Sequence, residues 1–137
     1  MLIGVPREIK ADEYRVGLTP TSVRELCAAG HQVLAETGAG QGIGMSDAAY
    51  NRAGAEIVGD ADELFARAEM IIKVKEPQPV ECARLREGQI LFTYLHLAPD
   101  PEQAAALVES GVIAIAYETV TAPDGSLPLL APMSEVA

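Results

Sequence analysis

The sequence predicts an α/β domain, Rossmann-like or flavodoxin-like, with three layers built around a mostly parallel sheet. Short apolar runs alternate with helical patterns along most of the chain, which is typical of βαβ units. A length of 137 residues fits one domain, and 49% hydrophobic against 22% charged residues is enough to bury a core. Crossovers between parallel strands then put helices on both faces of the sheet.

Six strands are predicted from apolar runs that end at glycine, proline or polar residues. The run at 89–96 gives the strongest strand signal, and the run at 112–117 is almost uniformly apolar. Uniform apolarity is typical of a strand that is buried on both faces of a parallel sheet. In chain order, the predicted strands are 2–5, 31–36, 56–58, 70–75, 89–96 and 112–117.

Helix starts are predicted where a capping side chain precedes a helical pattern. Asp60 with Glu63, and Asp100 with Gln103, have the spacing of a capping box. Helix ends are predicted at glycines, because only glycine enters the left-handed conformation without strain. The predicted helices begin at Pro20 after Thr19, after Ser46, after Asp60, at Val80 and at Pro101, with a further helix over 132–137.

A glycine-rich segment at 37–44 lies between a predicted strand and a predicted helix, where dinucleotide-binding domains carry a phosphate-binding turn. None of Gly38, Gly40 and Gly42 begins a GxGxxG motif, because positions 43, 45 and 47 are not glycine. We therefore interpret the segment as a flexible turn rather than a phosphate cradle.

Charge and composition exclude several classes of partner. Ten basic against twenty acidic residues give a net charge of −10, which repels nucleic acid and anionic membranes. No apolar run has membrane-spanning length and the start does not resemble a secretory signal, so we expect a cytoplasmic protein. Cys27 and Cys82 lack CxxC spacing and only His31 lies near Cys27, so neither a disulfide framework nor a metal site is predicted.

Reactive side chains collect where the predicted strands end. Arg15 follows the first strand, Lys73 and Lys75 end the strand from Met70, and His96 ends the strand from Gln89, while Glu118 follows the last strand. In open parallel sheets, ligands bind beyond the carboxyl ends of the strands. We therefore expect one polar pocket at this edge.

Two interpretations of the cations stay open on sequence alone. Arg15 can hold a carboxylate through paired N–H bonds and Lys75 can add a second positive charge. Alternatively, Arg15 forms a surface ion pair with Asp12 or Glu13. Lys73 and Lys75 are two residues apart and would share one strand face, where crowding lowers a pKa unless the strand end is solvated.

His96 also has two interpretations. An imidazole at a strand end can act as a general acid or base near neutral pH. A histidine in apolar surroundings is more often a core residue bonded to a backbone carbonyl. The cations expected at neighbouring strand ends favour the catalytic interpretation.

Six motifs are distributed along the chain: GVPRE at 4–8, RVGLTP at 15–20, KVKEP at 73–77, FTYLHLA at 92–98, AYETV at 116–120 and LPLLAPMSE at 127–135. Together they resemble the alanine dehydrogenase and pyridine nucleotide transhydrogenase family, in its amino-terminal, substrate-binding domain, and the resemblance covers essentially the whole chain. It favours the alanine-oxidising branch, because the transhydrogenase relatives lack the YLH and KEP arrangements.

The resemblance implies reversible oxidative deamination of L-alanine to pyruvate and ammonia with NAD. It implies that Arg15 and Lys75 bind the substrate, that His96 donates and accepts the proton, and that Met133 and Ser134 contact the cofactor. Residues 1–130 would form the substrate-binding domain and 131–137 the start of a linker helix to an NAD-binding domain. Family members are hexamers, and carboxy-terminal segments of the polypeptide return to complete the first domain.

Because the chain contains no dinucleotide turn, we expect these 137 residues alone to be inactive. The alternatives are a domain like that of the transhydrogenase alpha subunit and a non-catalytic module that binds oxo acids. A phosphoacceptor receiver domain shares the layered fold but needs paired acidic residues after the first strand, where this chain has Pro6, Arg7 and Glu8.

Overall fold

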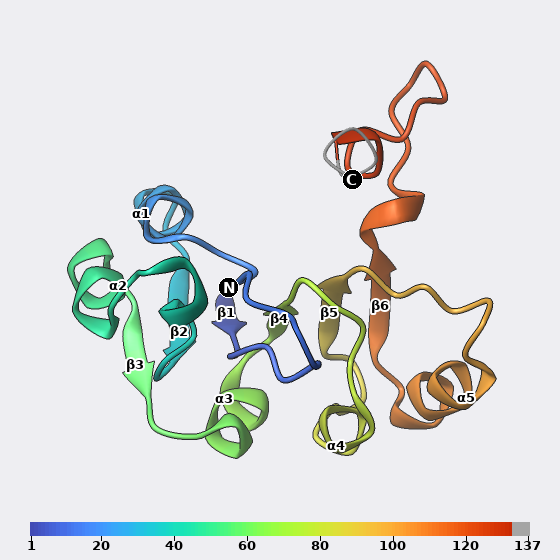
Figure 1. The fold of residues 1–137 in the computed structure, drawn as a ribbon, viewed down its shortest axis with the longest axis horizontal. Helices are drawn as coiled ribbons and strands as arrows, with labels where there is room; N and C mark the ends of the chain where they lie inside the picture. The colour runs from blue at the N-terminus through green and yellow to red at the C-terminus, as the bar shows by residue number, and fades with distance from the viewer. Residues whose placement is uncertain (133–137) are drawn as a thin grey trace.

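A computed structural model describes residues 1–132 and confirms the α/β prediction. Six strands form one sheet in the order β3-β2-β1-β4-β5-β6, and every neighbouring pair is parallel (Figure 1). This order is that of a doubly wound, Rossmann-like sheet and not that of flavodoxin. The strands are β1 (Leu2–Val5), β2 (Gln32–Glu36), β3 (Glu56–Val58), β4 (Met70–Ile72), β5 (Ile90–Thr93) and β6 (Ile113–Ala116).

Four of the five helices in residues 1–132 begin at the predicted caps, and the fifth begins at Pro79, one residue before its predicted start. Thr19, Ser46, Asp60 and Asp100 each accept a hydrogen bond from the backbone N–H three residues later. At Asp100 the capping box is half-formed, because the Gln103 side chain donates to the Leu95 carbonyl instead. The helices are α1 (Pro20–Ala28), α2 (Asp47–Ala53), α3 (Ala61–Arg67), α4 (Pro79–Cys82) and α5 (Pro101–Ser110), with 3-10 turns η1 (Gln41–Ile43) and η2 (Tyr117–Thr119).

Helices cover the two faces of the sheet unequally. α1 and α2 lie on one side of the strands, and α3, α4 and α5 lie on the other (Figure 1). Alternate residues of β2 feed two cores: Val33 and Ala35 pack with the α1 and α2 cluster, whereas Leu34 packs with the α3, α4 and α5 cluster. This alternation is the period of two that a strand imposes on its side chains.

Three predicted elements are too long. β4 ends at Ile72 and β5 at Thr93, so Lys75 and His96 lie in loops beyond the strands. The Glu8 side chain accepts from the N–H of Lys75, which replaces a strand partner there. The helix predicted over 80–86 is the single turn α4, after which the chain continues in turns.

The prediction that the last strand is buried on both faces is wrong. β6 lies at the edge of the sheet, where Ile113 is 53% and Ile115 40% exposed. Only Ala116 of this strand is buried in the part of the chain that the structure describes. The apolar composition therefore predicted the strand correctly, but it did not predict how exposed the strand is.

No helix within residues 1–132 is long and apolar enough to cross a membrane. The helix predicted over 132–137 lies, apart from Pro132, outside the described residues.

Candidate functional site

The candidate site lies beyond the carboxyl ends of β1 and β4. These two strands are neighbours although β2 and β3 separate them in the chain, so strand order reverses between them. Ligands of doubly wound sheets bind at such a switch point. Arg15 comes from the loop after β1 and Lys75 from the loop after β4, and both line one cavity of about 390 Å³.

Arg15 is bonded to Glu13, as one of its two interpretations predicted. Its Nε donates to Glu13 Oε2 at 2.9 Å and its Nη2 donates to Oε1 at 2.6 Å. The guanidinium lowers the pKa of the Glu13 carboxyl to about 2. The Arg15 side chain remains 46% exposed while that of Glu13 is 5% exposed. Glu13 therefore orients a cation that still reaches the cavity, and carboxylate binding by Arg15 stays a prediction.

Two glycines let the Arg15 loop approach the sheet. A Cβ on Gly17 would lie 2.6 Å from the Ile72 carbonyl oxygen, at the end of β4. A Cβ on Gly42 would lie 2.2 Å from the carbonyl oxygen of Tyr14, the residue before Arg15. Both distances are far inside van der Waals contact, so any side chain here would displace the loop.

The glycine-rich segment serves this packing. The N–H groups at 41, 43 and 44 donate to carbonyl oxygens within the segment, that of Ala39 donates to the Glu36 carbonyl, and that of Gly38 donates to the Asp47 carboxylate at 2.9 Å. These donors are thus already used within the protein. The segment contains the 3-10 turn η1, and Gly42 has a packing role that the sequence analysis did not identify.

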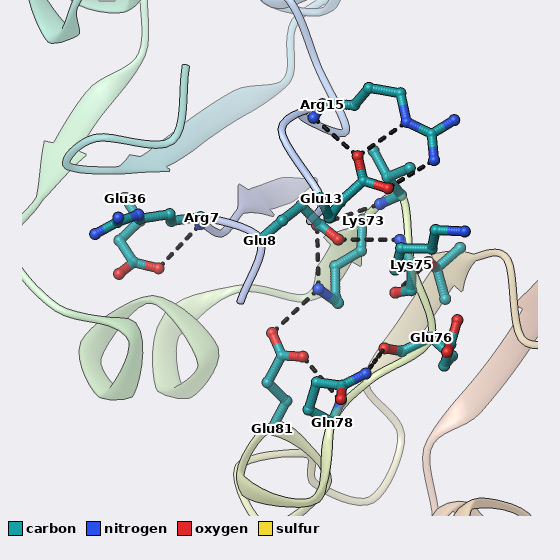
Figure 2. A network of polar contacts seen from close by, with 12 residues as sticks. Arg7, Glu8, Glu13, Arg15, Glu36, Lys73, Lys75, Glu76, Gln78 and Glu81 are labelled. Carbon is teal, nitrogen blue, oxygen red and sulfur yellow. Dashed lines mark hydrogen bonds and ion pairs between the residues drawn. The ribbon is translucent and has the colours of Figure 1, made fainter. Parts of the chain in front are cut away.

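Lys73 is at the centre of a buried ionic cluster, which we call the Lys73 cluster: Lys73, Glu8 and Glu81. Its Nζ lies 3.1 Å from a carboxylate oxygen of each glutamate, and the three side chains are only 1–2% exposed (Figure 2). Glu81 also accepts from the N–H of Gln78 at the start of α4. The expectation that Lys73 and Lys75 share one face is therefore wrong, because the strand has ended and Lys73 points into the cluster.

Glu8 connects the Lys73 cluster to the cavity. Besides its ion pair with Lys73, it accepts from the backbone N–H of Val74 at 3.3 Å and of Lys75 at 3.0 Å. The Lys75 carbonyl in turn accepts from the Thr93 hydroxyl at 2.9 Å. Both the backbone N–H and the backbone C=O of Lys75 are thus hydrogen-bonded, while its side chain lines the cavity.

An apolar cavity of about 560 Å³ adjoins Arg15 on its other side. Its wall includes Tyr94 and Tyr117, whose rings meet edge to face with centroids 4.9 Å apart. The Tyr117 hydroxyl donates to the Lys73 carbonyl at 2.7 Å, and burial raises the pKa of that phenol. The Arg15 side chain thus has an apolar surface beside it, where electrostatic contacts are stronger than in bulk water.

His96 follows β5, the strand next to β4, at the same edge of the sheet. It is exposed, which excludes the interpretation as a core histidine. It does not line the 390 Å³ cavity or the apolar cavity. Its backbone is in the left-handed region at φ 47°, and its N–H donates to Glu118 Oε1 at 2.9 Å.

The structure thus brings Arg15 and Lys75 together and leaves His96 one strand away. Met133 and Ser134 lie outside the described residues. Among residues 1–132 there is no group of three or more His, Cys, Asp or Glu that could hold a metal ion.

The sequence analysis did not identify Glu8 and Glu81 as site residues. The spacing of Gln78 and Glu81 was a helix-capping signal that could have found Glu81, whereas no local signal pointed to Glu8.

Comparison with known proteins gives a consistent result. The family model for the alanine dehydrogenase/PNT N-terminal domain matches residues 4–137. An alanine dehydrogenase from Mycobacterium tuberculosis (strain CDC 1551 / Oshkosh) is 55% identical over the whole chain, which spans 37% of that protein.

Solved structures agree with this. An L-alanine dehydrogenase superposes over the whole chain with a TM-score of 0.96 and 54% identity, and the chain covers 38% of it. A transhydrogenase from Sinorhizobium meliloti covers 86% of this chain with a TM-score of 0.81 and 29% identity, over 35% of its own length. The chain therefore spans little more than a third of the relatives that it matches.

Proposed function

The chain belongs to the alanine dehydrogenase/PNT N-terminal domain family, and from that premise we propose that it supplies the substrate-binding part of an NAD-dependent alanine dehydrogenase. The reaction would be the reversible oxidative deamination of L-alanine to pyruvate and ammonia. The observation that carries the proposal is the shared cavity of Arg15 and Lys75 at the switch point of the sheet.

Arg15 and Lys75 would bind the carboxylate and carbonyl region of pyruvate. A guanidinium and an ammonium beside one cavity suit a small oxo acid in a chain whose net charge of −10 otherwise repels anions. Hydrogen bonds between charged groups contribute about 1.5–3 kcal/mol each. Glu13 and Glu8 support this arrangement, because they fix the Arg15 side chain and the Lys75 backbone respectively.

His96 would move the proton. Oxidation of alanine at Cα leaves an imine, water adds to the imine carbon, and the resulting carbinolamine collapses to pyruvate and ammonia. The attacking water loses a proton, and the hydroxyl loses another as the C–N bond breaks, so a base is needed beside that oxygen. The exposed imidazole of His96 can accept and return this proton as the reaction runs in either direction.

The glycine-rich segment lacks the GxGxxG motif, most of its N–H groups donate to other groups of the protein, and Gly42 packs on Tyr14. We propose that NAD binds mainly to the part of the longer relatives that this chain does not cover, with contacts from Met133 and Ser134. Residues 1–130 would then be the substrate domain and 131–137 the start of the linker.

The assembly and location of the protein are proposed from the family alone. We expect a cytoplasmic hexamer that acts on L-alanine and pyruvate. The exposed face of β6 supports a further expectation, that later segments of the polypeptide complete this domain. A fragment of 137 residues would then bind pyruvate weakly and oxidise no NADH.

Replacing His96 with Ala tests the proposed chemistry in a polypeptide of the relatives' full length. Loss of an acid–base group lowers turnover about 10²–10⁴-fold, while the KM for pyruvate should change little, because Arg15 and Lys75 still bind the carboxylate. Steady-state NADH oxidation with pyruvate and ammonium measures both values. His31→Ala, a distant histidine, is the matched control.

Two other outcomes would contradict the proposal. Unchanged turnover in His96→Ala would favour a non-catalytic module that binds oxo acids. Robust NADH oxidation by the 137-residue chain alone would show that the cofactor site lies within it. A transhydrogenase-like function has less support, because identity to the Sinorhizobium meliloti protein is 29% against 54% for the L-alanine dehydrogenase structure.

A further inference from the structure

We propose that Glu118 is a positioning residue for His96: its carboxylate fixes the backbone turn that presents the imidazole. This inference rests on the proposed function, since it concerns the residue that would move the proton there. It assigns a role to a carboxylate that lies beyond the last strand of the sheet, in the 3-10 turn η2.

The geometry is a clamp on two successive peptide groups. Glu118 Oε1 accepts from the N–H of Leu95 at 3.0 Å and from the N–H of His96 at 2.9 Å. Both donors belong to the loop after β5, and the acceptor comes from the neighbouring β6 side, 22 residues further along the chain. The loop conformation is therefore set from outside the loop.

This clamp holds a conformation that the loop does not prefer. His96 has φ 47°, in the left-handed region, where a residue with a Cβ is disfavoured by about 1–2 kcal/mol. At this turn the side chains of two successive residues lie in different environments: Leu95 is 3% exposed and packs in the core, whereas His96 is exposed to solvent. Without the clamp, the loop is expected to relax and His96 to lose its fixed position.

Glu118 is also not optimised for stability alone. Its second oxygen, Oε2, is buried and has no hydrogen-bond partner among the described residues. A buried acceptor without a protein partner is unfavourable by about 1–3 kcal/mol, and such groups are rare in native structures. Glu8, by contrast, makes bonds with both of its oxygens.

A double-mutant cycle in the full-length enzyme separates positioning from general stabilisation. Glu118→Ala should lower kcat for pyruvate amination about 10- to 100-fold, with the KM for pyruvate changed less than about threefold. In a His96→Ala background, the same substitution should change kcat less than about twofold, because the group that it positions is already gone. Glu109→Ala, an exposed glutamate on α5, is the matched control.

A conservative variant tests the clamp itself. The amide oxygen of Glu118→Gln can accept the same two N–H bonds, so kcat should recover to within about fivefold of the parent enzyme. If Glu118→Gln is as impaired as Glu118→Ala, or if the Glu118→Ala loss persists in full without His96, the inference is wrong. If His96→Ala alone leaves turnover unchanged, the proposed function fails instead. This variant also gives a result if Glu118→Ala does not fold.

Discussion

On each half of the sheet edge, a glutamate holds a loop by accepting hydrogen bonds from two successive backbone N–H groups. The two glutamates differ in whether both of their carboxylate oxygens have partners. On the β1 and β4 half, Glu8 accepts from two successive N–H groups and is itself paired with Lys73. On the β5 and β6 half, Glu118 accepts from two successive N–H groups with one oxygen, and its other oxygen has no partner among residues 1–132. We call these the closed half and the open half.

The difference indicates a division of labour. The closed half has buried charges, tight glycine contacts and paired carboxylates, so it forms a rigid wall for the cavity of Arg15 and Lys75. The open half has an exposed histidine in a left-handed conformation and an exposed edge strand. Regions with few buried contacts are the ones that move most easily, so the loop of His96 depends on the two hydrogen bonds to Glu118 to keep its conformation.

Removing the ammonium of the Lys73 cluster should give the largest effect. Lys73→Met leaves two carboxylates buried without a cation, and breaking a buried pair in this way destabilises by about 3–5 kcal/mol. Urea unfolding measures the loss. Glu118→Ala on the open half should lose only about 1–2 kcal/mol in the same assay, because that carboxylate is half-buried.

Lys10→Met is the matched control, since it removes the same charge from the partly exposed ion pair of Lys10 with Glu76. Surface pairs of this kind contribute at most about 1 kcal/mol. Equal losses for Lys73→Met and Lys10→Met would show that burial adds nothing to the Lys73 cluster, and equal losses for Lys73→Met and Glu118→Ala would break the distinction between a closed and an open half.

A methyl group on Gly42 should give the next largest effect. Gly42→Ala meets the Tyr14 carbonyl oxygen at 2.2 Å, so the Arg15 loop must shift, and overpacking of this kind destabilises by about 1–3 kcal/mol. The KM for pyruvate in the full-length enzyme should rise with it. Gly59→Ala has nothing within 4 Å of the added Cβ and should change neither value.

The pH dependence of the Arg15 and Glu13 pair should be the smallest effect. The pKa of the Glu13 carboxyl is lowered from 4.5 to about 2 by its bonds to Arg15. The pair therefore stabilises the fold fully above pH 4.5 and loses this contribution as the pH falls from 4.5 toward 2. Because Arg15 is 46% exposed, the contribution should be no more than about 1 kcal/mol.

Comparing urea unfolding of the parent protein and Glu13→Gln at pH 7 and pH 3 measures that contribution. The difference between the two proteins should shrink at the lower pH. A difference that grows as the pH falls would contradict the direction of the shift.

Local features of the fold could be predicted because each has a local cause. The caps at Thr19, Ser46 and Asp60 act within one helical turn, so a few residues are enough to identify them. Strand ends were harder to predict. The strand from Met70 was predicted to run on to Lys75, but Glu8, from the other side of the switch point, takes the N–H groups of Val74 and Lys75.

The candidate site could be predicted only in part, for the same reason. Arg15 and Lys75 were identified because parallel strands bring their ends to one edge, and the structure puts both beside one cavity. The pairing of Lys73 with Glu8 joins residues 65 apart in sequence, and no spacing rule reports it. The exposure of β6 likewise depends on which elements lie next to it and not on its composition.

Strand order also has a consequence for synthesis on the ribosome. β1 pairs with both β2 and β4. The first strand to be synthesised therefore has one unpaired edge until the fourth strand has been synthesised. A nascent chain that stops before β4 carries Arg15 but not Lys75. The cavity that these two residues line therefore forms only once β4 and the loop after it have been translated, and a shorter chain would lack the substrate site that we propose.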